Sequence, residues 1–215
     1  MELYFAPLAC SLATRISLYE AGAPAAAARF TQVDTRAKRL ADGGDFLAVN
    51  PMGQVPVLRT DAGECLTENT AVLQYVAESF PAAKLVPDGT MARARLREWL
   101  GFIGTELHKA VFVPLLDANA PEAAKAYARE KLALRMGLLE KHLAGRQFLV
   151  DSFSVADAYL VTVLNWTLAT AVNLGEWPAV QDYHRRMSKR PSIARAFGEE
   201  LALYQAELAR AKSRA

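Results

Sequence analysis

The spacing of apolar and polar positions changes along the first eighty residues, and it predicts strands and helices in turn. Short apolar runs are typical of strands, whereas longer stretches with apolar residues every three or four positions are typical of helices. Gly22 follows the first such stretch and indicates a helix end. The predicted elements are a strand at 3–5, a helix at 11–21, a strand at 29–33, a hairpin of strands at 55–60 and 64–67, and a helix at 68–79.

This order of elements looks like the thioredoxin fold, in which the first two strands pair in parallel. Val55-Pro56 leads into the third strand. Proline cannot donate a ladder hydrogen bond, so it is tolerated at the first residues of a strand, where we expect a cis peptide bond. The N–H and C=O of Val55 then remain available to pair with a peptide-like ligand, as an added strand would.

Beyond residue 80 the pattern breaks at several prolines and a glycine, and everything that follows is helical. The predicted helices cover 91–111, 121–143, 154–172, 178–188 and 192 to the end. The fold class is therefore α/β plus all-α. We expect a thioredoxin-like domain at 1–80, a linker at 81–90 and an all-helical domain at 91–215.

The predicted helix at 91–111 has two distinct faces. At about 100° per residue, one apolar face collects Leu96, Trp99, Leu100, Ile103, Leu107 and Ala110. Gly101, Thr105 and His108 fall together on a separate flank. We expect the apolar face to pack inside the helical domain and the flank to face the thioredoxin-like domain across a ligand cleft. His142 and His184 have no such neighbours and are interpreted as surface residues.

Ser154-Val155-Ala156-Asp157 has the form of a capping box, with a hydroxyl at the helix start and an acid three positions on. A catalytic role for Asp157 is the alternative. We favour the capping role, because the helix behind it is apolar nearly all round and its first turn needs acceptors. Polar residues interrupt this apolar segment, so we interpret it as a buried core helix rather than a membrane span.

Charge and cysteine content narrow the classes of partner. The 25 basic residues are mixed with 23 acidic ones, so the sequence predicts neither nucleic acid nor a membrane surface as a partner. The N-terminus lacks the features of a signal peptide, and we expect a cytoplasmic protein with reduced thiols. Two cysteines and three histidines show no zinc-ligand spacing, so we expect no metal. Cys65 lies within a predicted strand and is expected in the core.

Cys10 is the first candidate for chemistry, because it lies where the first strand gives way to a helix. Unpaired N–H groups and the helix dipole favour a thiolate at such a position. The alternative is a small buried hydrophobic side chain. Ser11 beside it has two equally good interpretations, a hydrogen-bond donor to a sulfur or the N-cap of the helix.

Taken together, these segments resemble a glutathione S-transferase. The resemblance rests on Cys10 after the first strand and on four motifs in order: Asn50-Pro51-Met52-Gly53-Gln54-Val55-Pro56, Leu66-Thr67-Glu68-Asn69, Thr105-Glu106-Leu107-His108-Lys109, and Phe153-Ser154-Val155-Ala156-Asp157. A cysteine in place of tyrosine or serine, together with the third motif, makes the bacterial beta class the most similar. The resemblance covers almost the whole chain and implies glutathione as co-substrate and a homodimer.

The resemblance also implies roles for single residues. Val55 matches the residue whose backbone pairs with the cysteinyl part of glutathione, and Glu68 matches the acid that receives the γ-glutamyl ammonium. Asn69 and the helix N-terminus behind it offer donors to the γ-glutamyl carboxylate. Lys38 matches a lysine near the glycyl end, although Arg36 and Arg39 compete for that role.

The site implied by the resemblance therefore comprises Cys10, Ser11 and His108 as catalytic residues. The glutathione-binding residues are Cys10, Lys38, Val55, Glu68, Asn69, Thr105 and His108. The chain departs from the family pattern at Leu8, where glycine is frequent, at Met52 and Gly101, which replace polar residues, and at Asn69, which replaces a smaller one.

The reaction implied is attack of the glutathione thiolate on a small hydrophobic electrophile. Thiol–disulfide exchange or reductive dehalogenation through a mixed disulfide at Cys10 is the close alternative. A noncatalytic binding module is a further alternative from another class. The joint presence of Cys10, Val55, Glu68 and His108 favours an enzyme, since a binding module would need none of them.

Overall fold

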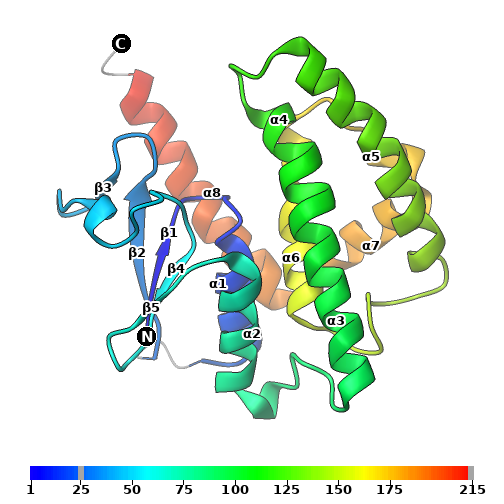
Figure 1. Cartoon of the computed structure of the whole chain (residues 1–215), viewed down its shortest axis with the longest axis horizontal. Helices are drawn as coiled ribbons and strands as arrows, with labels where there is room; N and C mark the ends of the chain where they lie inside the picture. The colour runs from blue at the N-terminus through cyan, green and yellow to red at the C-terminus, as the bar shows by residue number, and fades with distance from the viewer. Residues whose placement is uncertain (24–26, 213–215) are drawn as a thin grey trace. The chain divides into compact units, whose positions relative to one another are not determined.

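The structure is a computed structural model that describes residues 1–23 and 27–212. The chain forms two compact units (Figure 1). The sheet unit comprises Met1–Lys84 together with the chain from Pro191 on, and the helical unit comprises Leu85–Arg190.

The sheet unit contains a mixed five-stranded sheet in the order β3-β2-β1-β4-β5. Its strands are β1 (Glu2–Phe5), β2 (Arg29–Asp34), β3 (Arg39–Leu40), β4 (Val57–Arg59) and β5 (Cys65–Leu66), and its helices are α1 (Leu12–Glu20), α2 (Asn69–Ser79) and α8 (Pro191–Lys212). β1 and β2 are parallel and the other pairs antiparallel, so the predicted thioredoxin-like order is confirmed. β3 was not predicted, because two residues are too short to produce an alternating pattern.

Side chains of β1 alternate between two apolar layers, as strand geometry requires. Leu3 and Phe5 lie in one layer with residues of α1 and α2, against which Leu203 of α8 also packs. Tyr4 lies in the other layer with Phe46, which belongs to the short helix η1 (Phe46–Ala48). The sheet is therefore covered on both faces, and the segment that links β1 to α1 lies at one end of it.

The expected domain boundaries differ from the observed units in two respects. The residues expected as a linker at 81–90 are divided between the units, which meet at Lys84 and Leu85. The helix expected at the end of the helical domain is α8, which lies alongside α1 in the sheet unit (Figure 1). Its Ile193, Ala196 and Glu200 are all buried. An amphipathic sequence shows that a helix must bury one face, but it does not show which other element covers that face.

The helical unit contains α3 (Thr90–Phe102), η3 (Ile103–Phe112), α4 (Val113–Leu116), α5 (Glu122–Leu143), α6 (Val155–Asn165), η4 (Trp166–Ala169), η5 (Leu174–Glu176) and α7 (Pro178–Ser188). α5 and α7 match the predicted helices closely. The helix predicted at 91–111 is α-helical only to Phe102 and continues as the π-helix η3. The helix predicted at 154–172 ends at Asn165 and gives way to the 3-10 helix η4.

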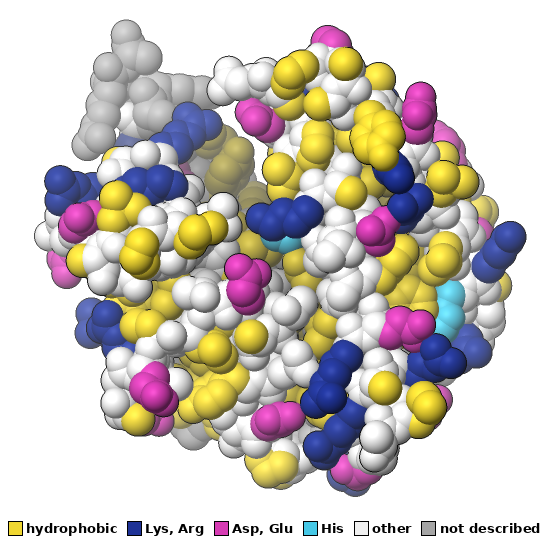
Figure 2. Space-filling model, in the orientation of Figure 1, with side chains coloured by type: hydrophobic (Ala, Val, Ile, Leu, Met, Phe, Trp, Pro, Cys, Tyr) yellow, Lys and Arg dark blue, Asp and Glu magenta, His cyan; other side chains and the backbone are white. Residues whose placement is uncertain are grey.

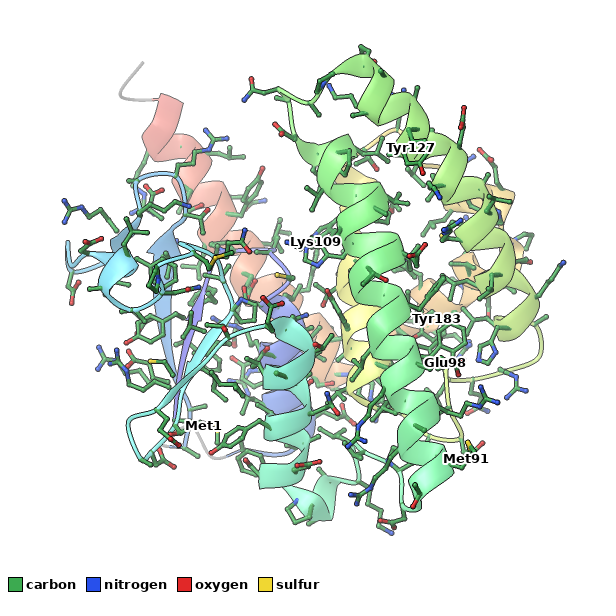
Figure 3. The ribbon with its side chains drawn as sticks, in the orientation of Figure 1. Met1, Met91, Glu98, Lys109, Tyr127 and Tyr183 are labelled. Carbon is green, nitrogen blue, oxygen red and sulfur yellow. The ribbon has the colours of Figure 1, made fainter. Side chains whose placement is uncertain are left out.

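The capping box at the start of α6 is confirmed. Asp157 is fully buried, and its Oδ2 accepts hydrogen bonds from the N–H and the hydroxyl of Ser154, each at 2.9 Å. Its Oδ1 accepts from the N–H of Leu149 at 3.0 Å and from the hydroxyl of Tyr183 at 2.9 Å. Tyr183 lies on α7, among the helices of this unit (Figure 3). One carboxyl group thus ties three segments together.

Acidic and basic side chains are interspersed over the face of the molecule seen in Figure 2. Among the described residues no helix is both long and apolar enough to span a bilayer. Two expectations about side chains are wrong. Cys65 is exposed on the edge strand β5 rather than in the core, and His142 and His184 are half-buried. Their ring nitrogens hydrogen-bond to Leu149 and Asn165, respectively.

Candidate active site

Cys10 lies in the short segment between β1 and α1, two residues before α1 begins. Its side chain is half-buried, and its thiol donates to the carbonyl oxygen of Val55 at 3.3 Å. The peptide bond from Val55 to Pro56 is cis, as predicted. The Val55 carbonyl, expected to be available to a ligand, already accepts this bond from the Cys10 thiol, and a carbonyl oxygen can accept a second one. The structure therefore brings Cys10 and Val55 into direct contact.

Ser11 occupies the N-cap position of α1, but its side chain does not cap the helix. It is fully buried, and its hydroxyl donates to the carbonyl oxygen of Ala6 at 3.3 Å and accepts from the N–H of Ala6 at the same distance. The predicted cap hydrogen bond is not formed, because the side chain turns back toward the end of β1, and the role as a donor to a sulfur stays a prediction. Ser11 shapes the segment that carries Cys10.

Lys38 lies against the loop that leads to the cis proline. Its Nζ donates to the carbonyl oxygen of Gly53 at 2.9 Å, and a Cβ at Gly53 would come within 2.9 Å of its Cδ. Lys38 is half-buried, whereas Arg36 and Arg39 are exposed. Of the three candidate cations, Lys38 is the one fixed beside the residues that precede Val55.

Asn50 is a structural residue of this loop that the sequence did not single out. It is buried, its amide donates to the carbonyl oxygen of Gln54 at 2.8 Å, and its Oδ1 accepts from the N–H of Met52 at 3.1 Å. These bonds fix the loop between Asn50 and Val55. An asparagine followed by proline and, two residues later, glycine is a turn signal that could have indicated this role.

Glu68 and Asn69 lie at the N-terminus of α2 and differ sharply from each other. Glu68 is exposed and has φ 66° and ψ 115°, a conformation that costs free energy in any residue except glycine. Asn69 is only 7% exposed, and neither its Oδ1 nor its Nδ2 has a hydrogen-bond partner among the described residues. A buried amide without partners is costly, and native proteins retain few of them. A strained acid and an unpaired amide thus stand side by side where the helix offers unpaired N–H groups.

His108 lies in the helical unit, on η3 beside the exposed Lys109 labelled in Figure 3. It is buried, its Nδ1 lies 2.7 Å from the hydroxyl oxygen of Tyr159, and its ring meets that of Trp166 edge-on. Burial, with a smaller effect of Lys109, lowers the pKa of His108 to about 4. The imidazole is therefore neutral at pH 7 and still carries one N–H donor.

His108 differs in burial from the two residues expected on the same flank, and its place in a ligand cleft stays a prediction. Gly101 and Thr105 are exposed, and the Thr105 hydroxyl donates to the carbonyl oxygen of Gly101 at 3.0 Å. A π-helical turn contains more residues than an α-helical one, so the three steps from Thr105 to His108 fall well short of a full turn. The π-helix thereby turns His108 toward the buried side of the unit.

The candidate site residues thus fall into three groups. Cys10, Val55 and Lys38 lie around the loop before the cis proline, and Glu68 and Asn69 lie at the start of α2, all in the sheet unit. Thr105 and His108 belong to the helical unit. Among the described residues no group of three or more acidic, histidine or cysteine side chains is placed to hold a metal ion.

Two family models match consecutive parts of the chain. Residues 1–78 match the N-terminal domain of glutathione S-transferases, and residues 104–191 match their C-terminal domain. Glutathione S-transferase GstA of Escherichia coli O157:H7 is 40% identical over 204 residues, which cover 93% of this chain and 98% of that protein.

Solved structures give the same result. A sphingomonad glutathione S-transferase complexed with glutathione is 41% identical, with a TM-score of 0.87 over 93% of this chain and 98% of that one. A bacterial beta class glutathione S-transferase from Sphingomonas chungbukensis is 40% identical, with the same TM-score and the same coverage. The chain therefore belongs to the glutathione S-transferase family of enzymes, in its bacterial beta class.

Proposed function

We propose that this enzyme joins the thiol of glutathione to small hydrophobic electrophiles, at a site that includes Cys10, Val55, Glu68, Asn69 and Lys38. The observation that carries the proposal is the buried, unpaired amide of Asn69 beside the strained Glu68. Such a pair is costly in the protein alone and becomes favourable when a ligand supplies the missing partners. A relative of known structure is complexed with glutathione, which supports this ligand.

Each end of the tripeptide has a chemically matched group. The exposed carboxylate of Glu68 suits the γ-glutamyl ammonium, and the Asn69 amide with the N-terminus of α2 suits the γ-glutamyl carboxylate. At the other end, the Lys38 ammonium suits the glycyl carboxylate. Its bond to the carbonyl oxygen of Gly53 engages one of its three N–H donors, so others remain to bind a carboxylate.

The reacting sulfur belongs beside Cys10 and Val55. The backbone of Val55 is proposed to pair with the cysteinyl part of glutathione, as an added strand would. A thiolate at this place attacks the electrophilic carbon, a sulfur–carbon bond forms, and the leaving group departs with its bonding electrons. Thr105 and His108 stay in the proposal on the resemblance alone. A neutral His108 is a hydrogen-bond donor over the whole physiological pH range.

A second activity at the same thiol is thiol–disulfide exchange. The Cys10 thiol is half-buried and lies against the carbonyl of Val55, where a peptide backbone is proposed to bind. The Cys10 thiolate would attack oxidised glutathione, forming a mixed disulfide and releasing one glutathione thiolate. In reductive dehalogenation a glutathione thiolate would first displace halide from carbon. The Cys10 thiolate would then attack the sulfur of that conjugate, releasing a carbanion that takes up a proton, and a second glutathione would reduce the mixed disulfide left on Cys10.

The test compares wild type with Cys10→Ala and Asn69→Ala. Wild type should turn over chlorodinitrobenzene with glutathione and be retained on immobilised glutathione, and Asn69→Ala should lose most retention. Intact mass after exposure to oxidised glutathione should show an adduct on wild type that Cys10→Ala lacks. Neither turnover nor retention by wild type would contradict the conjugation proposal, and equal adducts on both proteins would contradict the exchange proposal.

We also propose a homodimer and a cytoplasmic location, where glutathione and protein thiols are kept reduced. Leu47 and Met52, near the loop before the cis proline, expose 42% and 71% of their surface, which supports an apolar contact between copies of the sheet unit. Gel filtration with light scattering should give a dimer for wild type and more monomer for Met52→Lys. A monomeric wild type would contradict the proposal.

A further inference from the structure

A buried carboxylate on α8 holds the segment that carries Cys10. Glu200 is fully buried, and its Oε2 accepts a hydrogen bond of 2.8 Å from the N–H of Leu8. Its Oε1 lies 2.9 Å from Nε of Arg15 on α1. Cys10 lies between these two attachment points, two residues after Leu8 and five before Arg15.

Leu8 has φ 60°, in the left-handed region that a leucine rarely adopts. Such a conformation persists only where the surroundings over-determine it. The bond from the Leu8 N–H to Glu200 is one such constraint, and a residue 192 positions away along the chain supplies it. This departure from glycine at position 8 therefore coincides with a specific contact to its backbone.

Arg15, the ion-pair partner of the Glu200 carboxylate, is itself held in place by packing. Its guanidinium is stacked between the rings of Phe5 and Phe30, 4.3 and 4.1 Å from their centres, and is only 5% exposed. Burial raises the pKa of Glu200 to about 7, although Arg15 and the Leu8 N–H act to lower it. Glu200 is thus an acidic residue in a place where burial opposes its charge, and it contacts the segment that carries Cys10.

If Glu200 served only to attach α8 to α1, its hydrogen bond with Leu8 would not be needed. Glu199, the neighbour of Glu200, already bonds Arg15 at 3.1 Å and accepts from the hydroxyl of Tyr19, and Arg195 bonds Glu199 at 2.9 Å. Glu200 differs from Glu199 in that it also accepts a hydrogen bond from the segment before Cys10. Glu199 therefore has contacts that suit a purely structural role, whereas Glu200 also contacts the segment that positions Cys10.

We propose that Glu200 is a positioning residue for the glutathione reaction, which holds Leu8 in its left-handed conformation and thereby keeps the Cys10 thiol against the carbonyl of Val55. The role acts through the backbone of residue 8. It rests on the proposed part of Cys10 in the site and extends that site to the last helix of the chain.

The test uses Glu200→Ala, Glu200→Gln and the matched control Glu199→Ala, each in a Cys65→Ser background so that Cys10 is the one remaining thiol. Glu200→Ala should be alkylated by iodoacetamide at least fivefold faster and show at least a fivefold higher KM for glutathione. Glu199→Ala should stay within twofold of its parent in both. Glu200→Gln should also stay within twofold, because its amide oxygen still accepts from the Leu8 N–H.

Equal effects of Glu200→Ala and Glu199→Ala, or a Glu200→Gln as impaired as Glu200→Ala, would overturn the proposal. Should Glu200→Ala not fold, amide hydrogen exchange decides. The Leu8 amide must be protected in wild type and in Glu200→Gln, and rapid exchange there would equally overturn it. The alkylation and exchange measurements need no glutathione, so they remain decisive even if Cys10 proves to have no part in conjugation.

Discussion

Asn69 has a buried side-chain amide that is costly to the fold and that we propose to bind glutathione. Its buried amide has no partner among the described residues, so the fold gains no hydrogen bond from it. Asn50, a short distance away in the sequence, is equally buried but has both of its polar atoms bonded. The two asparagines therefore make a matched pair for mutation.

Replacing Asn69 by alanine should weaken glutathione binding without weakening the fold. Hydrogen bonds to charged groups are worth about 1.5–3 kcal/mol, so the KM for glutathione should rise roughly 10- to 100-fold. The free energy of unfolding in urea without glutathione should not fall, because no bond is lost. Asn50→Ala, in contrast, should lower it. A loss of stability in Asn69→Ala as large as that in Asn50→Ala would contradict this assignment.

His108 should make stability depend on pH in a predictable direction. Its pKa of about 4 in the folded protein lies below the ordinary value of 6.5, so the unfolded chain binds the proton more readily. Its contribution is fully present above pH 6.5 and is lost as the pH falls toward 4, up to about 3 kcal/mol. Urea unfolding at pH 7, 5.5 and 4.5 should show a smaller decrease for His108→Gln than for wild type. Equal decreases would refute the prediction.

At the scale of single elements, α6 depends on one carboxyl group. Asp157→Ala removes four hydrogen-bond acceptor contacts in a buried place. The expected loss is about 3 kcal/mol, which corresponds to a melting temperature roughly 5–10 °C lower. Calorimetry should show this, with Asp182→Ala on the exposed side of α7 as a control that changes little. An unchanged melting temperature would show that Asp157 does not carry this role.

Elements that are determined by the residues within them, without contacts from distant parts of the chain, could be predicted from the sequence. The strands of the hairpin, the cis proline and the capping box follow from side-chain alternation, the missing proline donor and the acid at the third helical position. The π-helix η3 was not, because the periodicity test assumes an α-helix. The sequence therefore identified His108 as a candidate but did not predict that it is buried while Gly101 and Thr105 are exposed.

Contacts between distant parts of the chain were the least predictable. The partner of Leu8 is 192 residues away, and Asn69 is recognisable as unpaired only once its surroundings are known. The capping bond expected of Ser11 is absent for a related reason, since the local path of the loop brings its hydroxyl to Ala6. The family resemblance indicated which residues belong to the site. Their hydrogen-bond partners could be identified only from the folded structure.

At the scale of the whole molecule, the sheet unit is assembled from both ends of the chain. A polypeptide of residues 1–84 alone should fail to fold stably, because Arg15 would be left without Glu199 and Glu200 and the apolar layer without Leu203. Joining residues 191–212 to it through a flexible linker should restore cooperative unfolding by circular dichroism. Equally cooperative unfolding of both polypeptides would contradict a structural need for α8.

Because the sheet unit is made of two separate parts of the chain, its last helix is synthesised after the whole helical unit. The helical unit is continuous in sequence, so all of its residues have been made before the first residue of α8 is added. At about 5–20 residues per second, the ribosome needs roughly 5–20 s to translate that unit. During this interval the nascent sheet unit lacks its last helix, and Arg15 lacks its two acids. The segment that carries Cys10 is therefore completed only after α8 has been made.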